Sequence, residues 1–198
     1  MNKKPEGCKE CALFKLGAGF CTHSTLVDNP RLLIQGEAPG KNEVIEGVPF
    51  VGKSGNWLRR LLESCGLNEG EVVFDNTIRC LYTKGKAKYP TGKVRQQAEQ
   101  TCRQYDIWER YVGCPILLVG GKALRTWLDD DKISKWHGHI EVIRGRLVGC
   151  TYHPAAVLRN PNLIPLFVQE TRNLLNAARN PALIKHPRVN KGYLLHAK

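Results

Sequence analysis

The spacing of apolar residues along the chain predicts two kinds of element, short buried strands and amphipathic helices. Short apolar runs bounded by polar or glycine-rich stretches indicate strands that are buried on both faces. Apolar residues that recur three and four positions apart indicate helices, as in KSGNWLRRLLESC, which a glycine ends. The predicted strands are 31–35, 72–79, 115–119 and 146–151, and the predicted helices are 53–65, 94–111, 120–128 and 163–179.

The order of these elements predicts an α/β fold. Strands alternate with helices, which implies a mostly parallel sheet covered by helices on both faces. No internal repeat is present, and 198 residues suit a single domain with a real core. We expect this domain at 1–180, opening with an irregular segment rich in glycine and cysteine, and a basic tail at 181–198.

Each predicted strand ends in polar or glycine-rich residues, and this pattern predicts a binding site. In open α/β sheets ligands bind outside the carboxyl ends of the strands, so we expect the four ends to converge. The first end resembles a phosphate-binding loop, yet it has neither the Walker A motif nor the glycine spacing of a dinucleotide site. The four ends read Gly36-Glu37-Ala38-Pro39-Gly40, Asp75-Asn76, Gly120-Gly121 and Tyr152-His153-Pro154.

The charge balance favours a nucleic-acid partner. Lys and Arg number 30 against 18 Asp and Glu, which gives a formal net charge of +12. Such an excess suits phosphate contacts, because they release condensed counterions; a basic surface without a partner is the alternative. The predicted tail supplies only part of the excess, through Lys185, Arg188, Lys191 and Lys198.

The chain carries no signal for a membrane or for export. No stretch reaches the roughly 18 consecutive apolar residues of a membrane span. The start, MNKKPEGCKEC, turns polar where a signal peptide needs an apolar segment. We therefore expect a soluble protein of the cytoplasm without membrane contact. We also expect a monomer, from a prokaryote or a virus.

Eight cysteines are either buried apolar residues or metal ligands, because disulfides are not expected in a reducing cytosol. Cys8 and Cys11 form a C-x2-C pair, and two more thiolates would complete a zinc site or hold an iron–sulfur cluster. Spacing alone does not choose between these metals. The other candidates are Cys21, Cys80, Cys102 and three residues in apolar elements that suit the core better, Cys65, Cys114 and Cys150.

Two residues near strand ends and one aromatic residue in a loop are candidates for ligand contact. Alone, His153 would be an ordinary turn residue, but its place opposite two carboxylates and an asparagine favours an electrophilic hydrogen-bond donor. Asn76 alone could equally form a turn. Phe50 lies between two loop glycines, where an aromatic ring more often meets a ligand than the core. The tryptophans have no such loop and are interpreted as packing residues: Trp57, Trp108, Trp127 and Trp136.

Together these residues resemble the iron–sulfur, family 4 type uracil-DNA glycosylases, from about Cys8 to Arg179. The shared motifs are C-x2-C, GEAPG followed by GVPFVGKSG, Asn76 shortly before Cys80, the helical Cys102, and TYHPAAVLR. The resemblance implies a three-layer α/β/α sandwich with a central, mostly parallel four-stranded sheet. It also implies hydrolysis of the N-glycosidic bond of deoxyuridine in DNA, which releases uracil and leaves an abasic site.

The resemblance assigns a role to individual residues of the uracil pocket. Phe50 would stack on uracil beside Gly36 and Ala38. Asn76 would accept from N3–H and donate to O4, because an amide offers both groups. His153 would donate toward O2, where negative charge grows as uracil leaves. A [4Fe–4S] cluster would be bound by Cys8, Cys11, Cys80 and Cys102.

The resemblance also assigns residues that would position the water and contact the DNA. Glu37 is the first choice to position the water and to stabilise the developing sugar cation, and Glu43 is the second. A base in a duplex must first be flipped out of the stack, so a wedge is needed. The expected DNA contacts, with single- or double-stranded DNA, are Lys53, Ser54 and Arg159 on phosphates, and Val157 and Leu158 in the vacated stack.

The chain departs from the family pattern at several positions. Ala38 stands where better-known uracil glycosylases have an aspartate, Val44 replaces one member of an acidic pair, and Ala155 replaces a serine. The insert YTKGKAKYPTGK lengthens the interval between Cys80 and Cys102, and it has no histidine that could trap uracil-DNA covalently. A non-catalytic DNA-binding module on the same scaffold is the alternative. An intact set of Glu37, Phe50, Asn76 and His153 favours the enzyme.

Overall fold

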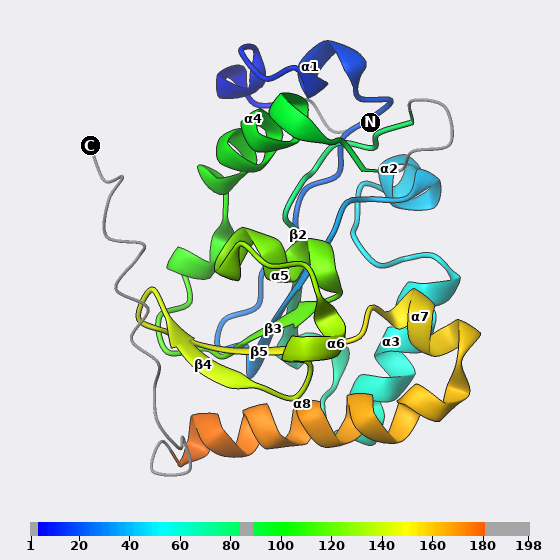
Figure 1. Ribbon diagram of the computed structural model, residues 1–198, viewed down its shortest axis with the longest axis vertical. Helices are drawn as coiled ribbons and strands as arrows, with labels where there is room; N and C mark the ends of the chain where they lie inside the picture. The colour runs from blue at the N-terminus through cyan, green and yellow to red at the C-terminus, as the bar shows by residue number, and fades with distance from the viewer. Residues whose placement is uncertain (1–3, 84–88, 181–198) are drawn as a thin grey trace.

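Five strands form one sheet in the order β2-β1-β3-β5-β4 (Figure 1). The computed structural model describes residues 4–83 and 89–180, so the tail 181–198 and three lysines of the insert, Lys84, Lys86 and Lys88, lie outside the described residues. The first four strands in this order run parallel, and β4 runs antiparallel to β5. The strands are β1 (Leu32–Gly36), β2 (Val72–Asn76), β3 (Ile116–Val119), β4 (Ile140–Ile143) and β5 (Arg146–Thr151).

Helices connect these strands and cover both faces of the sheet. The α-helices are α1 (Leu13–Leu16), α2 (Lys41–Glu46), α3 (Lys53–Ser64), α4 (Gly92–Arg103), α5 (Gly121–Leu128), α6 (Ile133–Trp136), α7 (Pro154–Arg159) and α8 (Ile164–Arg179). Short 3-10 turns are η1 (Glu6–Cys8), η2 (Glu69–Glu71), η3 (Ile107–Glu109) and η4 (Pro161–Leu163). None of the described helices is long and apolar enough to cross a bilayer.

The alternation of side chains along each strand divides the core in two. On β1, Leu32 and Ile34 pack in a cluster with residues of α3 and α8, while Leu33 packs in a second cluster with residues of α5. Successive strand residues point to opposite faces, so a strand buried on both sides must be apolar throughout. The expected three-layer α/β/α sandwich is confirmed.

The predicted sheet lacked one strand. The structure adds β4, which forms a hairpin with β5 through Arg144 and Gly145. Both turn residues have positive φ, 53° and 72°, which is the geometry of the tight turns that join antiparallel strands. The turn has Arg-Gly instead of the usual Asn-Gly, so the sequence pattern did not predict it.

The helix predicted at 94–111 ends early. Its last α-helical residue is Arg103, and η3 follows after a break. Tertiary contacts hold the segment that follows the break: Arg79 donates to the carbonyl of Tyr105, and Arg146 donates to the carbonyls of Trp108 and Tyr111. The apolar period alone could not reveal these partners.

A third core cluster fixes the N-terminal segment to the rest of the fold. It joins Leu13 of α1, Phe20, Ile78 and Ala98 of α4. Phe20 also forms a β-bridge with Cys80, just beyond β2. Figure 1 shows α1 and α4 together at the end of the molecule that lies farthest from α8.

Candidate active site

The ends of β1 and β2 bring an aromatic ring and an amide to one point. A methyl group at Gly36 would lie 2.5 Å from Cζ of Phe50 and 2.6 Å from Oδ1 of Asn76. Only a glycine leaves both side chains this close to the backbone of β1. Phe50 and Asn76 are each 4% exposed, so what they contact there is largely shielded from water.

Asn76 is held through its backbone, which leaves its amide side chain for a ligand. Its backbone N–H donates to Oδ1 of Asp75 over 2.8 Å, and the next residue, Thr77, donates from its backbone to the carbonyl of Gly36. Within the described residues the structure gives the Asn76 side chain no hydrogen-bond partner. Buried amides are normally paired, so this one is suited to a ligand with a matching donor and acceptor.

The His153 ring is a neutral hydrogen-bond donor. Its Nδ1 accepts from the backbone N–H of Ala155 over 3.1 Å, so the proton of a neutral ring lies on Nε2. Burial, followed by the charge of Arg159, lowers the pKa of His153 to about 4. The ring centroid lies 6.5 Å from that of Phe50, with 28° between the planes. The imidazole is therefore neutral at physiological pH and can donate beside the aromatic ring.

The end of β3 makes room for this histidine. Gly120 has a φ of 93°, and a methyl group there would lie 3.0 Å from Cβ of His153. A side chain at this position would be both strained and crowded. The glycine pair that ends β3 therefore positions the ring that follows β5.

Glu37 and His153 share a cavity of about 320 Å³ formed by the loop after β1 and the segment 81–83. Ala38 also lines it, at the place where better-known relatives carry an aspartate. Burial raises the pKa of Glu37, and the charges of Lys122 and Arg125 act against this rise. The carboxylate thus faces the same space as the histidine donor.

Both carboxylate oxygens of Glu43, the second choice for the water, accept hydrogen bonds from the backbone. One of its oxygens accepts from the backbone N–H of Gly40 and the other from the backbone N–H of Phe50. Because both oxygens are occupied and Glu43 is absent from the lining of the cavity, the geometry favours Glu37 alone for the water. The carboxylate of Glu43 instead joins the loop after β1 to the loop that carries the aromatic ring.

The expected DNA contacts divide into exposed and buried residues. Lys53 is exposed and Ser54 half-buried in the first turn of α3, and Arg159 is exposed at the end of α7. Leu158 is 44% exposed, whereas Val157 is 0% exposed and packs in the core cluster that includes residues of α3 and α8. Of the two residues expected in the wedge, only Leu158 is accessible, because Val157 would have to leave the core to reach DNA.

Sequence reasoning missed Arg59, which donates to the carbonyl of Phe50. In the sequence it stands beside Arg60 on a helix and looks like one more surface charge. A sign was available, since an arginine four residues from Gly55 lies on the side of α3 that meets the Phe50 loop. Only the fold shows which of the two arginines turns inward.

Four cysteines gather in the N-terminal part of the fold. Burial, then neighbouring thiols, raises the pKa of Cys80 to about 11, and the thiols of Cys8 and Cys11 are among these neighbours. Burial also raises the pKa of Cys102 to about 12, and Cys80 and Cys11 contribute to it. All four are buried. Cys11, Cys80 and Cys102 pack in one core cluster, and the charge of the Cys8 thiolate would act on Cys80.

The number and arrangement of these four thiols decide which kind of metal group they could bind. In the part of the chain that the structure describes, no group of three or more His, Cys, Asp or Glu side chains is close enough to hold a single metal ion. In a four-iron cluster each thiolate binds a different iron, so the ligands surround the cluster instead of meeting at one ion. The four thiols fit a cluster in number and type.

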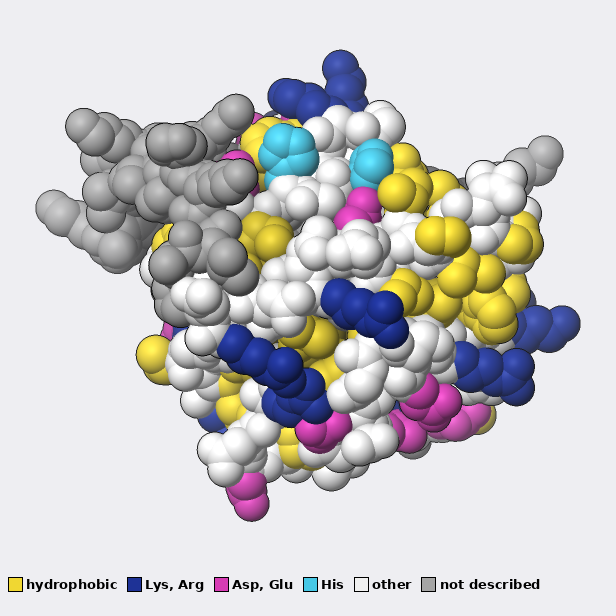
Figure 2. Space-filling model, turned by 90° about the horizontal axis from the view of Figure 1, so that it is seen from below, with side chains coloured by type: hydrophobic (Ala, Val, Ile, Leu, Met, Phe, Trp, Pro, Cys, Tyr) yellow, Lys and Arg dark blue, Asp and Glu magenta, His cyan; other side chains and the backbone are white. Residues whose placement is uncertain are grey.

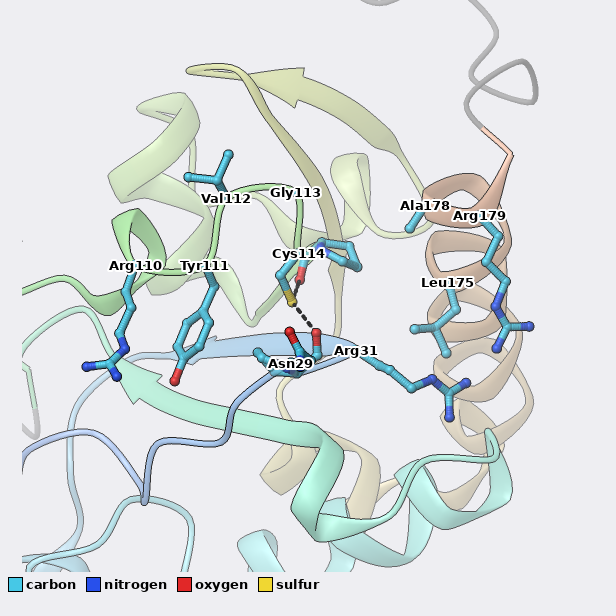
Figure 3. A pocket seen from close by; sticks show the side chains of 12 residues that line it. Asn29, Arg31, Arg110, Tyr111, Val112, Gly113, Cys114, Leu175, Ala178 and Arg179 are labelled. Atoms are coloured by element: carbon cyan, nitrogen blue, oxygen red, sulfur yellow. Dashed lines mark hydrogen bonds between the residues drawn. The ribbon is translucent and has the colours of Figure 1, made fainter.

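A larger cavity lies at the other end of the sheet. It has a volume of about 610 Å³ between the loop 110–115 and the end of α8 (Figure 3). Arg31, Arg110 and Arg179 line it, and the thiol of Cys114 donates to the carbonyl of Pro30 over 3.2 Å. The strands begin at this edge, whereas ligands of such sheets bind where parallel strands end. Its size alone does not make it the active site.

Comparisons with known proteins match most of the chain to one family. The model of the uracil DNA glycosylase superfamily matches residues 23–178. The chain is similar to the type-4 uracil-DNA glycosylase of Sulfurisphaera tokodaii, with 28% identity over 193 residues, 88% of this chain and 81% of that protein. It is 32% identical to the type-4 uracil-DNA glycosylase of Pyrobaculum aerophilum over 145 residues, 67% of this chain and 70% of that protein. For the type-4 enzyme of Thermotoga maritima the identity is 30% over 135 residues, 66% of this chain and 67% of that protein.

Proposed function

The chain belongs to the uracil DNA glycosylase superfamily, and from this we propose that it is a DNA repair enzyme. It hydrolyses the N-glycosidic bond of deoxyuridine in DNA, releases uracil and leaves an abasic site. The observation that carries the proposal is the meeting of Phe50 and Asn76 at Gly36, beside a cavity that Glu37 and His153 share. The type-4 names of its relatives agree with this activity.

Asn76 and Phe50 select the base. The Asn76 carbonyl accepts from uracil N3–H and its NH2 group donates to O4, while the Phe50 ring stacks on the base and Gly36 and Ala38 form the floor of the pocket. Cytosine presents the opposite pattern, an acceptor at N3 and a donor at N4. Each buried mismatch costs about 1–3 kcal/mol, so cytosine is excluded.

His153 stabilises the leaving uracil. As the glycosidic bond breaks, negative charge moves to the base and part of it to O2. A neutral imidazole with its proton on Nε2 donates a hydrogen bond to that oxygen without transferring the proton. Its pKa, lowered to about 4 by burial, keeps the ring in the donating form across the physiological range.

Glu37 acts on the sugar side of the bond. Its carboxylate positions the water that attacks the anomeric carbon, and its negative charge stabilises the positive charge that develops on the sugar. The aspartate of better-known relatives is absent at Ala38, so Glu37 is the carboxylate of the loop that faces the cavity. Glu37 therefore acts on the water and the sugar, and His153 acts on the leaving base, so opposite charges that develop in the reaction are stabilised by different residues.

The DNA is held at the rim of the site. The side chain of Leu158 enters the stack that the flipped nucleotide leaves, and Lys53, Ser54 and Arg159 contact phosphates. The base must leave the stack in duplex DNA, whereas a single strand needs less distortion.

The four cysteines hold a [4Fe–4S] cluster in this proposal. Its ligands are Cys8, Cys11, Cys80 and Cys102, which come from the N-terminal segment, the residues after β2, and α4. The cluster supplies a structural tie between these segments, because hydrolysis of a glycosidic bond transfers no electrons. The residues of the uracil pocket carry out the reaction.

A cleavage assay tests the proposed function. The protein is incubated with an oligonucleotide that carries one deoxyuridine, and abasic sites are then cleaved with alkali. We expect cleavage at uracil and none at cytosine or thymine. DNA binding without cleavage would favour the non-catalytic module on the same scaffold.

A further inference from the structure

Phe50 has a backbone conformation that an aromatic residue adopts only under constraint. Its φ is 59°, in the left-handed region, where a side chain costs free energy. Such a residue persists when its surroundings fix it from several sides. The contacts of its backbone N–H and carbonyl therefore show which residues hold the ring in place.

Arg59 holds the carbonyl of Phe50. One guanidinium nitrogen, Nη1, donates to that carbonyl, and Nε donates to Oε1 of Glu69 over 2.9 Å. The guanidinium also lies 5.0 Å from the centroid of the Phe74 ring, which in turn lies 5.6 Å from the Phe50 ring. The arginine side chain is 19% exposed, so its charge is mostly removed from water and fixed in direction.

The other side of Phe50 is fixed as well. Glu43 accepts from its backbone N–H, so an anion and a cation act on the two ends of one residue. A methyl group at Gly55 would overlap the Phe50 carbonyl, which shows how closely α3 approaches this loop. The backbone is thus held by groups from α2 and α3, on either side of Phe50 in the sequence.

We propose that Arg59 is a positioning residue for uracil recognition: it fixes the backbone of Phe50 so that the ring faces the base. The inference rests on the proposed function, because it needs a uracil to stack on that ring. Arg59 contacts neither base nor DNA and acts through Phe50. The planar guanidinium serves Phe50 and Glu69 in two directions at once, which a lysine ammonium on a flexible stem does less well.

The first experiment separates base recognition from stability and from DNA binding. Arg59→Met is compared with Arg60→Met, which removes the same charge from the exposed neighbour. We measure single-turnover excision, inhibition by free uracil, affinity for DNA with an abasic-site analogue, and the melting temperature. A lost hydrogen bond to a charged group corresponds to a change of about tenfold or more.

For Arg59→Met we expect free uracil to inhibit at least about tenfold more weakly, with a similar loss of excision. Affinity for the abasic DNA should stay as in the parent, because that DNA has no base to stack. Arg59→Lys, which keeps the charge, should fall between the parent and Arg59→Met. If Arg59→Met does not fold, Arg59→Lys carries the comparison with Arg60→Met.

A double-mutant cycle tests whether Arg59 acts through Phe50. In a Phe50→Ala background, Arg59→Met should lower excision by less than about twofold, because the ring that it positions is gone. Additive losses would overturn the inference, as would Arg59→Met behaving like Arg60→Met, or uracil and abasic DNA affinity falling together. A parent protein that neither excises nor binds uracil would overturn the proposed function, and this inference with it.

Discussion

Asn76 is the residue that we propose selects the base. Changing Asn76 to Asp removes the NH2 donor to O4 of uracil and places an oxygen against that oxygen. We expect uracil excision to fall by several orders of magnitude, since the buried hydrogen bond to O4 is lost at about 1–3 kcal/mol and a buried anion is placed against that oxygen as well. Single-turnover excision measures the loss, and circular dichroism checks the fold. A folded variant that excises uracil at the parent rate would show that Asn76 does not read the base.

The pH dependence of excision distinguishes Glu37 from His153. The pKa of Glu37 is raised by burial, so its carboxylate is lost at a higher pH than that of an ordinary glutamate. The pKa of His153 is lowered to about 4, so the ring stays neutral above that value. We therefore expect excision to fall on acidification through the raised pKa of Glu37, with no step at the usual pKa of a histidine.

Two variants test whether the fall in excision rate at acidic pH, the acid limb, comes from Glu37. Glu37→Gln should lower the rate by about 10²–10⁴-fold and leave it independent of pH on the acid side. His153→Gln should lower the plateau by about 10²–10³-fold and keep the acid limb. An acid limb that persists in Glu37→Gln would assign the titration to another group.

The lowered pKa of His153 also makes the folded protein less stable at acidic pH. Because its pKa is about 4 when folded and about 6.5 when unfolded, the unfolded chain binds more protons between these values. The contribution of His153 to the free energy of unfolding is complete above about 6.5 and is lost as the pH falls toward 4. Excision and stability should therefore be measured in the same pH series.

At the scale of elements, α7 connects the proposed catalytic histidine to the proposed DNA contacts. It starts directly after His153 and ends at Arg159, with Leu158 exposed between them. Leu158→Ala should lower excision from duplex DNA by about tenfold and affect a single strand less, because only a duplex has a stack to refill. Leu166→Ala on α8, which is 41% exposed, is the matched control. Equal losses on both substrates would argue against a wedge.

A buried ion pair joins β2 to the segment that leads to Cys80. Arg79 donates to Asp75 over 3.0 and 2.6 Å, and Asp75 also accepts from the backbone N–H of Asn76. Arg79→Met should lower the free energy of unfolding by about 3–5 kcal/mol, because it leaves a buried carboxylate without its partner. Urea unfolding measures this loss, with the exposed Arg60→Met as control. A loss no larger than that of the control would show that the pair contributes little.

At the scale of the whole molecule, the excess of basic side chains does not form a continuous basic surface on the side of α8. Figure 2 shows the side where α8 lies, and there the basic side chains stand apart, with acidic side chains among them. The proposed phosphate contacts, Lys53 and Arg159, lie instead on the helices that begin at the site loops. The net charge of +12 thus favours approach to DNA in general, while a few residues determine where it binds.

The proposed cluster ties the N-terminal segment to the sheet and should be visible in the purified protein. We expect brown protein with iron and labile sulfide in equal amounts. Cys80→Ala should lose the colour and melt at a lower temperature, whereas Cys114→Ala, a buried cysteine in a different core cluster, should keep the colour. Colourless protein that contains zinc would contradict the proposal.

The sequence by itself determined the layers of the fold and the place of the site. Apolar runs on β1, β2 and β3 had to be buried on both faces, because successive side chains of a strand point in opposite directions. The polar residues after each strand then had to meet, because parallel strands end at one edge. Asn76 and His153 could be named for this reason, and the motifs around them supplied the family.

The tertiary structure decided what depends on partners far apart in the chain. It ended α4 at Arg103, with Arg79 and Arg146 bound to carbonyls of the segment that follows, and it added β4 beside β5. It also assigned both oxygens of Glu43 to backbone groups and buried Val157. These outcomes follow from which backbone groups and surfaces meet after folding, and local spacing does not record them.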